Sequence, residues 1–170
     1  MGKQEPSVRV VPEFDYTDGP DAVKILSAGR LYTDPWQNTV LEDWMGMTDE
    51  GIWAASTCGL SVPRQNGKTL DTSGRIVSGM VMYGEWVIYT AHLQKTATET
   101  FLEIKSLFET PKLRNKVKEI KSALGREQII LKNGGRVMFV ARTRNGGRGL
   151  HGDCLVFDEA QELTSEQQAS

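Results

Sequence analysis

The turn Gly67-Lys68-Thr69 constrains the fold of this 170-residue chain more than any other feature. The mostly apolar run from Ile52 to Leu60 precedes the turn and predicts a short buried strand. Residues 68–83 follow the turn and predict a helix, which Gly74 and Gly79 weaken. A glycine turn that joins a buried strand to a helix favours an α/β domain.

The segment from Ser61 to Thr69 is close to the phosphate-binding loop pattern G-x-x-x-x-G-K-[ST], with Val62 in place of the first glycine. In such a loop, backbone N–H groups and the positive N-terminal end of the next helix surround phosphate groups. Gly67 would permit the close backbone approach, Lys68 would reach the β and γ phosphates, and the Thr69 hydroxyl would bind Mg²⁺. The alternative is an ordinary glycine turn followed by a helix-capping threonine.

A second run, Leu155-Val156-Phe157, ends on two carboxylates, as a Walker B strand does. Its apolar residues predict a buried strand at the centre of the sheet. Asp158 would hold Mg²⁺ directly or through water, and Glu159 would act as the general base on the attacking water. Ligands of open α/β sheets bind beyond the carboxyl ends of the strands, so both motifs are expected at one crevice. The alternative is a solvated acidic turn.

Hydrophobic periodicity and turn residues predict the remaining elements. They are a helix over Trp36–Met45, a strand over Trp86–Ala91, a helix through Ala97 and Phe108 that stops at Pro111, and a hairpin of Glu127–Lys132 with Arg136–Ala141. The order of these elements predicts an α/β domain with a mainly parallel sheet flanked by helices.

Charge and composition narrow the class of protein. Between Pro111 and Arg148 there are eleven basic and two acidic residues, so this stretch carries +9 while the whole chain carries −2. A polyanion such as DNA would be attracted to it, unless it is only a solvated face. No apolar run is long enough to span a bilayer, and no signal peptide is evident. Two cysteines do not form a disulfide framework, so we expect a cytoplasmic protein without membrane contact.

Four stretches together resemble the large terminase subunit of tailed bacteriophages, an ATP-driven DNA-packaging motor. They are Pro35-Trp36-Gln37, Val62 to Thr69, Tyr89-Thr90-Ala91-His92 with the helix start that follows, and Arg148 to Asp153 leading into Asp158-Glu159-Ala160. The resemblance implies a P-loop NTPase of the ASCE type, the ATPase branch with a catalytic glutamate beside the Walker B aspartate. It also implies ATP and Mg²⁺ as cofactors.

The resemblance assigns roles to individual residues. Gln37 resembles the glutamine that reads adenine, and Arg64 resembles the loop arginine at the γ-phosphate. Arg148 resembles the arginine that acts in trans on a neighbouring subunit's nucleotide, with Arg142 and Arg144 as rivals. The implied nucleotide-binding residues are Gln37, Arg64, Gln65, Asn66, Gly67, Lys68 and Thr69. The implied catalytic residues are Lys68, Glu159, Arg148 and Arg64, and the implied metal ligands are Thr69 and Asp158.

The resemblance further implies double-stranded DNA, a homo-oligomeric ring, a portal protein and a small terminase subunit as partners in the cytoplasm of a bacterial host. We expect residues 1–34 to form an arm and residues 35–170 to form a partial ATPase domain, incomplete at its C-terminus. The resemblance also implies a strand, placed after the Walker B strand in sequence, that lies between the Walker B strand and the phosphate-loop strand; because these residues do not supply it, we expect these two strands not to pair. We do not assign nuclease activity to these 170 residues. The alternatives are a different helicase-like motor or a nucleotide-binding fragment without turnover.

Overall fold

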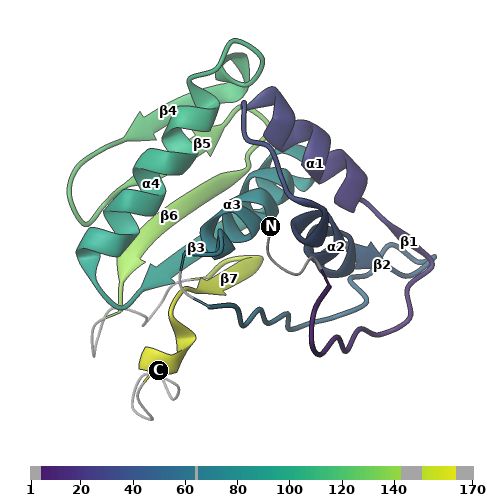
Figure 1. Ribbon diagram of the computed structural model, residues 1–170. Coiled ribbons are helices and arrows are strands. Elements are labelled where there is room, and N and C mark those ends of the chain that lie inside the picture. Colours follow the sequence, from purple (N-terminus) through teal and green to yellow (C-terminus); the bar gives the residue numbers. More distant parts are fainter. Residues whose placement is uncertain (1–4, 64, 143–150, 164–170) are drawn as a thin grey trace. The chain divides into compact units, whose positions relative to one another are not determined.

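The structure is a computed structural model that describes residues 5–63, 65–142 and 151–163 (Figure 1). The chain divides into two compact units, Met1–Ser78 and Gly79–Ser170. The first unit holds β1 (Tyr16–Thr17), α1 (Gly19–Ala28), α2 (Pro35–Trp44), β2 (Gly46–Met47) and α3 (Lys68–Ser78). The second holds η1 (Gly79–Tyr83), β3 (Trp86–Ala91), α4 (Gln94–Phe108), η2 (Arg114–Lys116), β4 (Val117–Lys121), β5 (Gln128–Leu131), β6 (Arg136–Ala141), β7 (Cys154–Phe157) and η3 (Ala160–Glu162).

Three helices, α1, α2 and α3, pack together in the first unit. Leu26 of α1 and Leu41 of α2 are fully buried. A Cβ on Gly74 of α3 would lie 2.9 Å from Leu26 Cδ1 and 3.1 Å from Leu41 Cδ2. The glycine that weakens the helix prediction is therefore the residue that allows all three helices to meet.

Helix α1 lies within the stretch that we expected to be an arm. Its Ala22 and Leu26 are spaced four residues apart on one face, and both are completely buried. Pro20 stands in the first turn of this helix, where a missing backbone N–H costs nothing. Residues 19–28 therefore form a packed helix, because Pro20 stands in the first turn of the helix instead of interrupting it.

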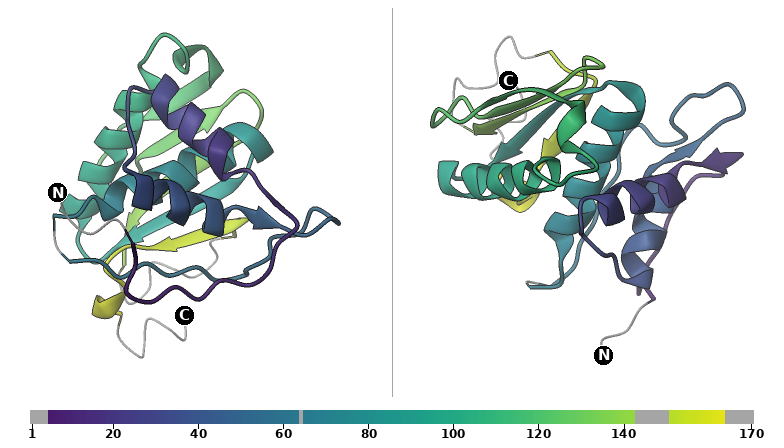
Figure 2. Two further views of the ribbon diagram at one scale, coloured as in Figure 1. Left: turned by 45° about the vertical axis from the view of Figure 1, so that its right-hand side comes forward. Right: turned by 90° about the horizontal axis from the view of Figure 1, so that it is seen from above.

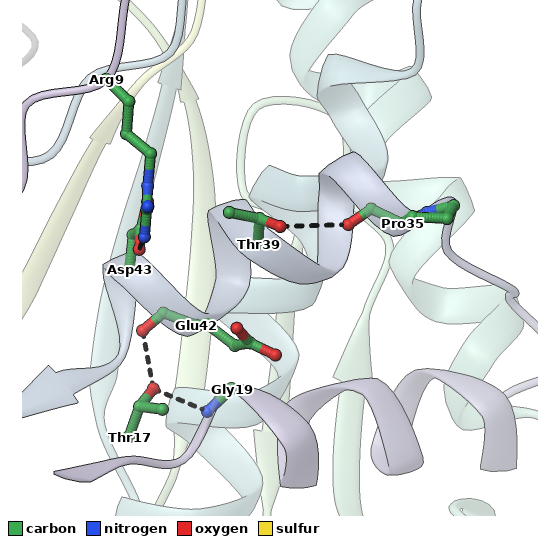
Figure 3. Close-up of polar contacts among 7 residues, drawn as sticks. All are labelled: Arg9, Thr17, Gly19, Pro35, Thr39, Glu42 and Asp43. Carbon is green, nitrogen blue, oxygen red and sulfur yellow. Dashed lines mark hydrogen bonds and ion pairs between the residues drawn. The ribbon is translucent and has the colours of Figure 1, made fainter. Parts of the chain in front are cut away.

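The segment before α1 is fastened to the end of α2 by polar contacts, which Figure 3 shows. The Arg9 guanidinium donates to both carboxylate oxygens of Asp43, at 2.6 and 2.8 Å. The Thr17 hydroxyl donates to the Glu42 carbonyl at 2.6 Å and accepts from the Gly19 N–H at 3.1 Å. These contacts fix the entry of the chain into α1 against α2.

The strand predicted over Ile52–Leu60 is not formed. Its one ladder contact among the described residues is an isolated bridge between Trp53 and Met47. Ile52 is 59% exposed, so the apolar residues of this run do not share a buried face. Trp53 instead lies under the Arg75 guanidinium, 4.6 Å from it, as a cation–π pair.

The second unit is built on a five-stranded sheet in the order β4-β5-β6-β3-β7. β3 pairs in parallel with β6 and with β7, whereas β4, β5 and β6 pair antiparallel. The sheet is therefore mixed and not mainly parallel. The difference arises because the predicted hairpin, which is confirmed, and the unpredicted strand β4 extend one side of the parallel core.

Helix α4 lies along one face of this sheet, as Figure 2 shows from two sides. The expected helix and the stop before Pro111 are confirmed. Phe101 of α4 meets Phe139 of β6 with ring centroids 5.5 Å apart, and Tyr89 of β3 lies 5.5 Å from the same ring. This aromatic cluster forms the centre of the second unit.

Strand β7 forms where the sequence predicts it but is not central. Among the described strands it pairs with β3 alone and ends the sheet. Leu155 is 53% exposed and Phe157 is 44% exposed, because side chains of an edge strand are covered from one side only. Within the described residues, no helix is long and apolar enough to cross a membrane.

Candidate functional site

The glycine loop opens α3 as predicted. Gln65 and Gly67 both adopt positive φ, 64° and 79°, which turns the chain sharply before the first helical residue, Lys68. The Asn66 side chain donates to the Pro63 carbonyl at 3.3 Å and so closes the loop on itself. The first-turn N–H groups of a helix have no intrahelical partner, so this turn is suited to an anion.

The residues that the sequence assigns to this loop are placed as follows. Gln65, Asn66 and Gly67 are exposed, and Lys68 and Thr69 are half-buried in the first turn of α3. Arg64 lies outside the described residues.

Gln37 links helix α2 to the loop. Its Oε1 accepts from the Asp34 N–H at 2.8 Å, the reciprocal half of a capping box, and its Nε2 donates to the Gly67 carbonyl at 3.1 Å. The side chain is 4% exposed. A carboxamide retains one N–H and one lone pair after these two bonds, and the adenine contact of Gln37 stays a prediction.

Asp71 is a buried carboxylate one turn into α3. It is completely buried, and neither of its oxygens has a hydrogen-bond partner among the described residues. Burial raises the pKa of Asp71 to about 7, while the nearby Gln37 amide lowers it only in part. Desolvation outweighs the amide here because a weak dipole does not replace water around a charge.

Asp158 is held at the end of β7 by two donors. The Tyr89 hydroxyl donates to Oδ2 at 2.7 Å, and the Glu159 N–H donates to Oδ1 at 2.9 Å. The Tyr89 oxygen lies 3.0 Å from the Thr100 hydroxyl of α4. Burial, and next to it the bond to Asp158, raises the pKa of Tyr89 well above its usual range, so the phenol keeps the proton it donates.

Arg142 follows β6 and reaches across β3 to the acidic pair. Its Nη1 donates to the Asp158 carbonyl at 2.8 Å and to the Thr90 carbonyl at 3.1 Å, and its Nη2 donates to the Glu159 carbonyl at 3.1 Å. Burial lowers the pKa of Arg142, and the charges of Asp158 and Glu159 oppose that shift. The guanidinium thus ties together the carboxyl ends of three adjacent strands.

Glu159 has a left-handed backbone, with φ 51° and ψ 52°, and is half-buried. For a residue other than glycine this conformation costs about 1 kcal/mol. Arg144 and Arg148, the other arginines of the sequence prediction, lie outside the described residues.

In the first unit, the structure brings Gln37 to Gly67. In the second unit, it brings Glu159 together with Asp158 and Arg142. Sequence reasoning missed Tyr89 as a partner of Asp158. The signal was present, because a tyrosine near the carboxyl end of a strand that pairs with β7 can reach the residue that follows β7.

The acidic pair is chemically suited to a hydrated divalent cation. The two carboxylate oxygens of Asp158 accept from the Tyr89 hydroxyl and the Glu159 N–H. Across residues 5–63, 65–142 and 151–163, no group of three or more His, Cys, Asp or Glu side chains forms a metal cage. A site with one or two carboxylates suits Mg²⁺, which retains waters and takes further ligands from substrate phosphates.

Comparison with solved structures finds a likeness to the crystal structure of the HK97 bacteriophage large terminase, with a TM-score of 0.68 and 19% sequence identity. The match covers 86% of this chain and 32% of that chain, so the present chain spans about a third of that terminase. The likeness confirms a terminase-like fold. No protein-family model matches the sequence, and no curated protein matches it.

Proposed function

We propose that this chain is the ATPase motor region of a terminase-type large subunit, which hydrolyses ATP with Mg²⁺ to drive double-stranded DNA into a procapsid. The observation that carries the proposal is the terminase-like fold, in which a sheet strand ends on Asp158 and Glu159. A likeness of fold alone leaves the chemistry open. The acidic pair and the glycine loop supply the chemical part of the argument.

The proposed division of labour follows the chemistry of each group. Residues 65–69 bind the phosphates, with Lys68 on the β and γ groups and the Thr69 hydroxyl toward Mg²⁺. Asp158 orients the hydrated Mg²⁺, which when bound neutralises charge on the phosphates. Glu159 accepts the proton of the attacking water. Gln37 recognises the adenine, and Arg64 and Arg148 stabilise the transferred phosphoryl group.

DNA contact is proposed for a basic rim on the second unit. The rim consists of the exposed residues Lys112, Arg114, Lys116, Lys118, Lys121, Arg126 and Lys132. Of the two acidic residues of this stretch, only Glu119 forms an ion pair with a described residue of the rim. Glu119 lies 3.9 Å from Lys121, and Glu127 is buried and accepts from the Thr98 hydroxyl at 2.8 Å.

The remaining partners also belong to the proposal. A homo-oligomeric ring, a portal protein and a small terminase subunit would act with this chain in the cytoplasm of the bacterial host. In the ring, an arginine of one subunit would reach the nucleotide of its neighbour.

The test is steady-state ATP turnover by the full-length protein, with and without double-stranded DNA. We expect DNA to stimulate turnover, and we expect Lys68→Ala and Glu159→Gln each to lower kcat by about 100-fold or more, because each removes a group that acts on the transferred phosphoryl or the water. Matched controls are Lys24→Ala and Glu162→Gln, which change an exposed lysine of α1 and an exposed carboxylate of η3.

Turnover that survives both substitutions would overturn the assignment. Calorimetric binding of ATP without any turnover would instead support a nucleotide-binding fragment. Turnover that depends on both residues, together with helicase motifs elsewhere in the reading frame, would support a different helicase-like motor.

A further inference from the structure

We propose that Arg142 is a positioning residue that holds the Asp158-Glu159 turn in place from within its own subunit. This inference rests on the proposed ATPase function and assigns Arg142 a role in cis. It separates Arg142 from the arginine that would act on a neighbouring subunit.

Both terminal nitrogens of Arg142 form hydrogen bonds within the second unit. Nη1 bonds the carbonyls of Thr90 and Asp158, and Nη2 bonds the carbonyl of Glu159, all within 3.1 Å. The backbone N–H of Arg142 also donates to the Ala91 carbonyl at 2.8 Å. A side chain that makes these bonds is not extended toward a second molecule.

The carbonyls that Arg142 bonds belong to the backbone whose conformation is costly. Glu159 is left-handed, and its carbonyl is one of the acceptors. Two further bonds support the same turn: the Asp158 N–H donates to the Thr90 carbonyl at 2.9 Å, and the Thr90 hydroxyl donates to the Val156 carbonyl at 2.9 Å. A strained backbone conformation persists only where surrounding contacts hold it, and the hydrogen bonds of Arg142 supply such contacts.

A planar guanidinium suits this task better than an ammonium group. Its two terminal nitrogens point to acceptors in a fixed fork, so one side chain reaches carbonyls on two successive residues. A lysine presents one compact charge and cannot bond the carbonyls of Asp158 and Glu159 with separate nitrogens. Arg142→Lys therefore tests the fork and not only the charge.

The first test is amide hydrogen exchange of residues 154–163 in the full-length protein. We expect Arg142→Gln to accelerate exchange of the Glu159, Glu162 and Leu163 amides by about tenfold or more, and Arg142→Lys to do so to a smaller extent. The control is Arg136→Gln at the other end of β6, where the guanidinium lies over the Trp86 ring at 3.6 Å. Exchange that is unchanged in Arg142→Gln would overturn the proposal.

The second test separates a role in cis from a role in trans. In Arg142→Gln and Arg142→Lys we expect kcat to fall by about tenfold or more while KM for ATP changes less than about threefold, because the turn carries Glu159 and not the phosphate loop. Each variant is then mixed with Glu159→Gln subunits under conditions that form mixed rings. A cis residue gives no recovery, since no subunit holds both side chains.

Recovery of turnover in the mixed rings would assign Arg142 to the neighbouring subunit's nucleotide and overturn the proposal. A wild-type protein without ATP turnover would count against the proposed function. In that case the exchange experiment would still decide whether Arg142 holds the turn.

Discussion

Asp71 shows how one buried side chain makes the stability of the first unit depend on pH. Its pKa of about 7 in the folded state exceeds the ordinary 3.8. A raised carboxyl pKa means that the folded state holds a proton more tightly than the unfolded state. Stability is then greatest below pH 4, declines as the pH rises to about 7, and is level above it.

We expect Asp71→Asn to remove this dependence. At pH 8 the variant should be more stable than the wild type by about 2–4 kcal/mol, and at pH 4 the two should be similar. Urea unfolding at both pH values, without nucleotide or Mg²⁺, measures the difference. Asp49→Asn, at an exposed position, is the control. An equal effect at both pH values would show that ionisation is not the cause.

Residue chemistry in the sequence identified the acidic pair but not how it is held. Asp34 and Gln37 have the spacing of a capping box, so the bond that the Asp34 N–H donates to Gln37 could be predicted from the sequence. Its second bond to Gly67, 30 residues away, depends on how α2 packs. The same holds for Arg142, because a sequence does not reveal which carbonyls lie beside a guanidinium.

At the scale of elements, helix α3 depends on the absence of a side chain at residue 74. Gly74→Val would place branched carbon atoms against Leu26 and Leu41, which are already in close contact. We expect a loss of about 1–3 kcal/mol from overpacking. Thermal or urea unfolding measures it, with Ser27→Val on the exposed face of α1 as the control for β-branching alone. A loss of equal size at Ser27 would contradict the packing argument.

Elements with a strong internal period were predictable, and elements defined by their neighbours were not. Helix α4 carries its buried face at helical spacing, and the hairpin carries its Asn-Gly turn. Strand β4 has two apolar residues, Val117 and Ile120, separated by two charged ones, so it lacks a strand period of its own and forms because β5 pairs with it. The run from Ile52 to Leu60 has apolar residues but no described neighbouring strand apart from one bridge, so composition alone misled the prediction.

At the scale of the whole molecule, a net charge of −2 conceals a basic rim that we expect to govern the response to salt. Lys118→Gln with Lys121→Gln should weaken DNA binding and reduce the slope of log affinity against log salt by about 1–2, because each lost phosphate contact removes about 0.9. Fluorescence anisotropy across a salt series measures the slope. Lys24→Gln with Lys95→Gln is the charge-matched control, and an equal change in that control would argue against the rim.

The general class of the molecule followed from the sequence, whereas the order of its strands did not. The succession of strands and helices predicts an α/β fold, and the likeness to a terminase agrees with it. The mixed sheet and the edge position of β7 arise from pairings between segments up to about 70 residues apart, which no local pattern encodes. Sequence reasoning therefore found the motifs but not the neighbours that position them.

The left-handed backbone at Glu159 has a consequence for laboratory evolution. Glycine adopts this conformation without penalty, so a library screened for thermal stability alone would favour glycine at position 159. The clones enriched by such a screen would gain heat resistance and lose the carboxylate at the end of β7. A stabilised version of this protein is therefore best selected with position 159 held fixed.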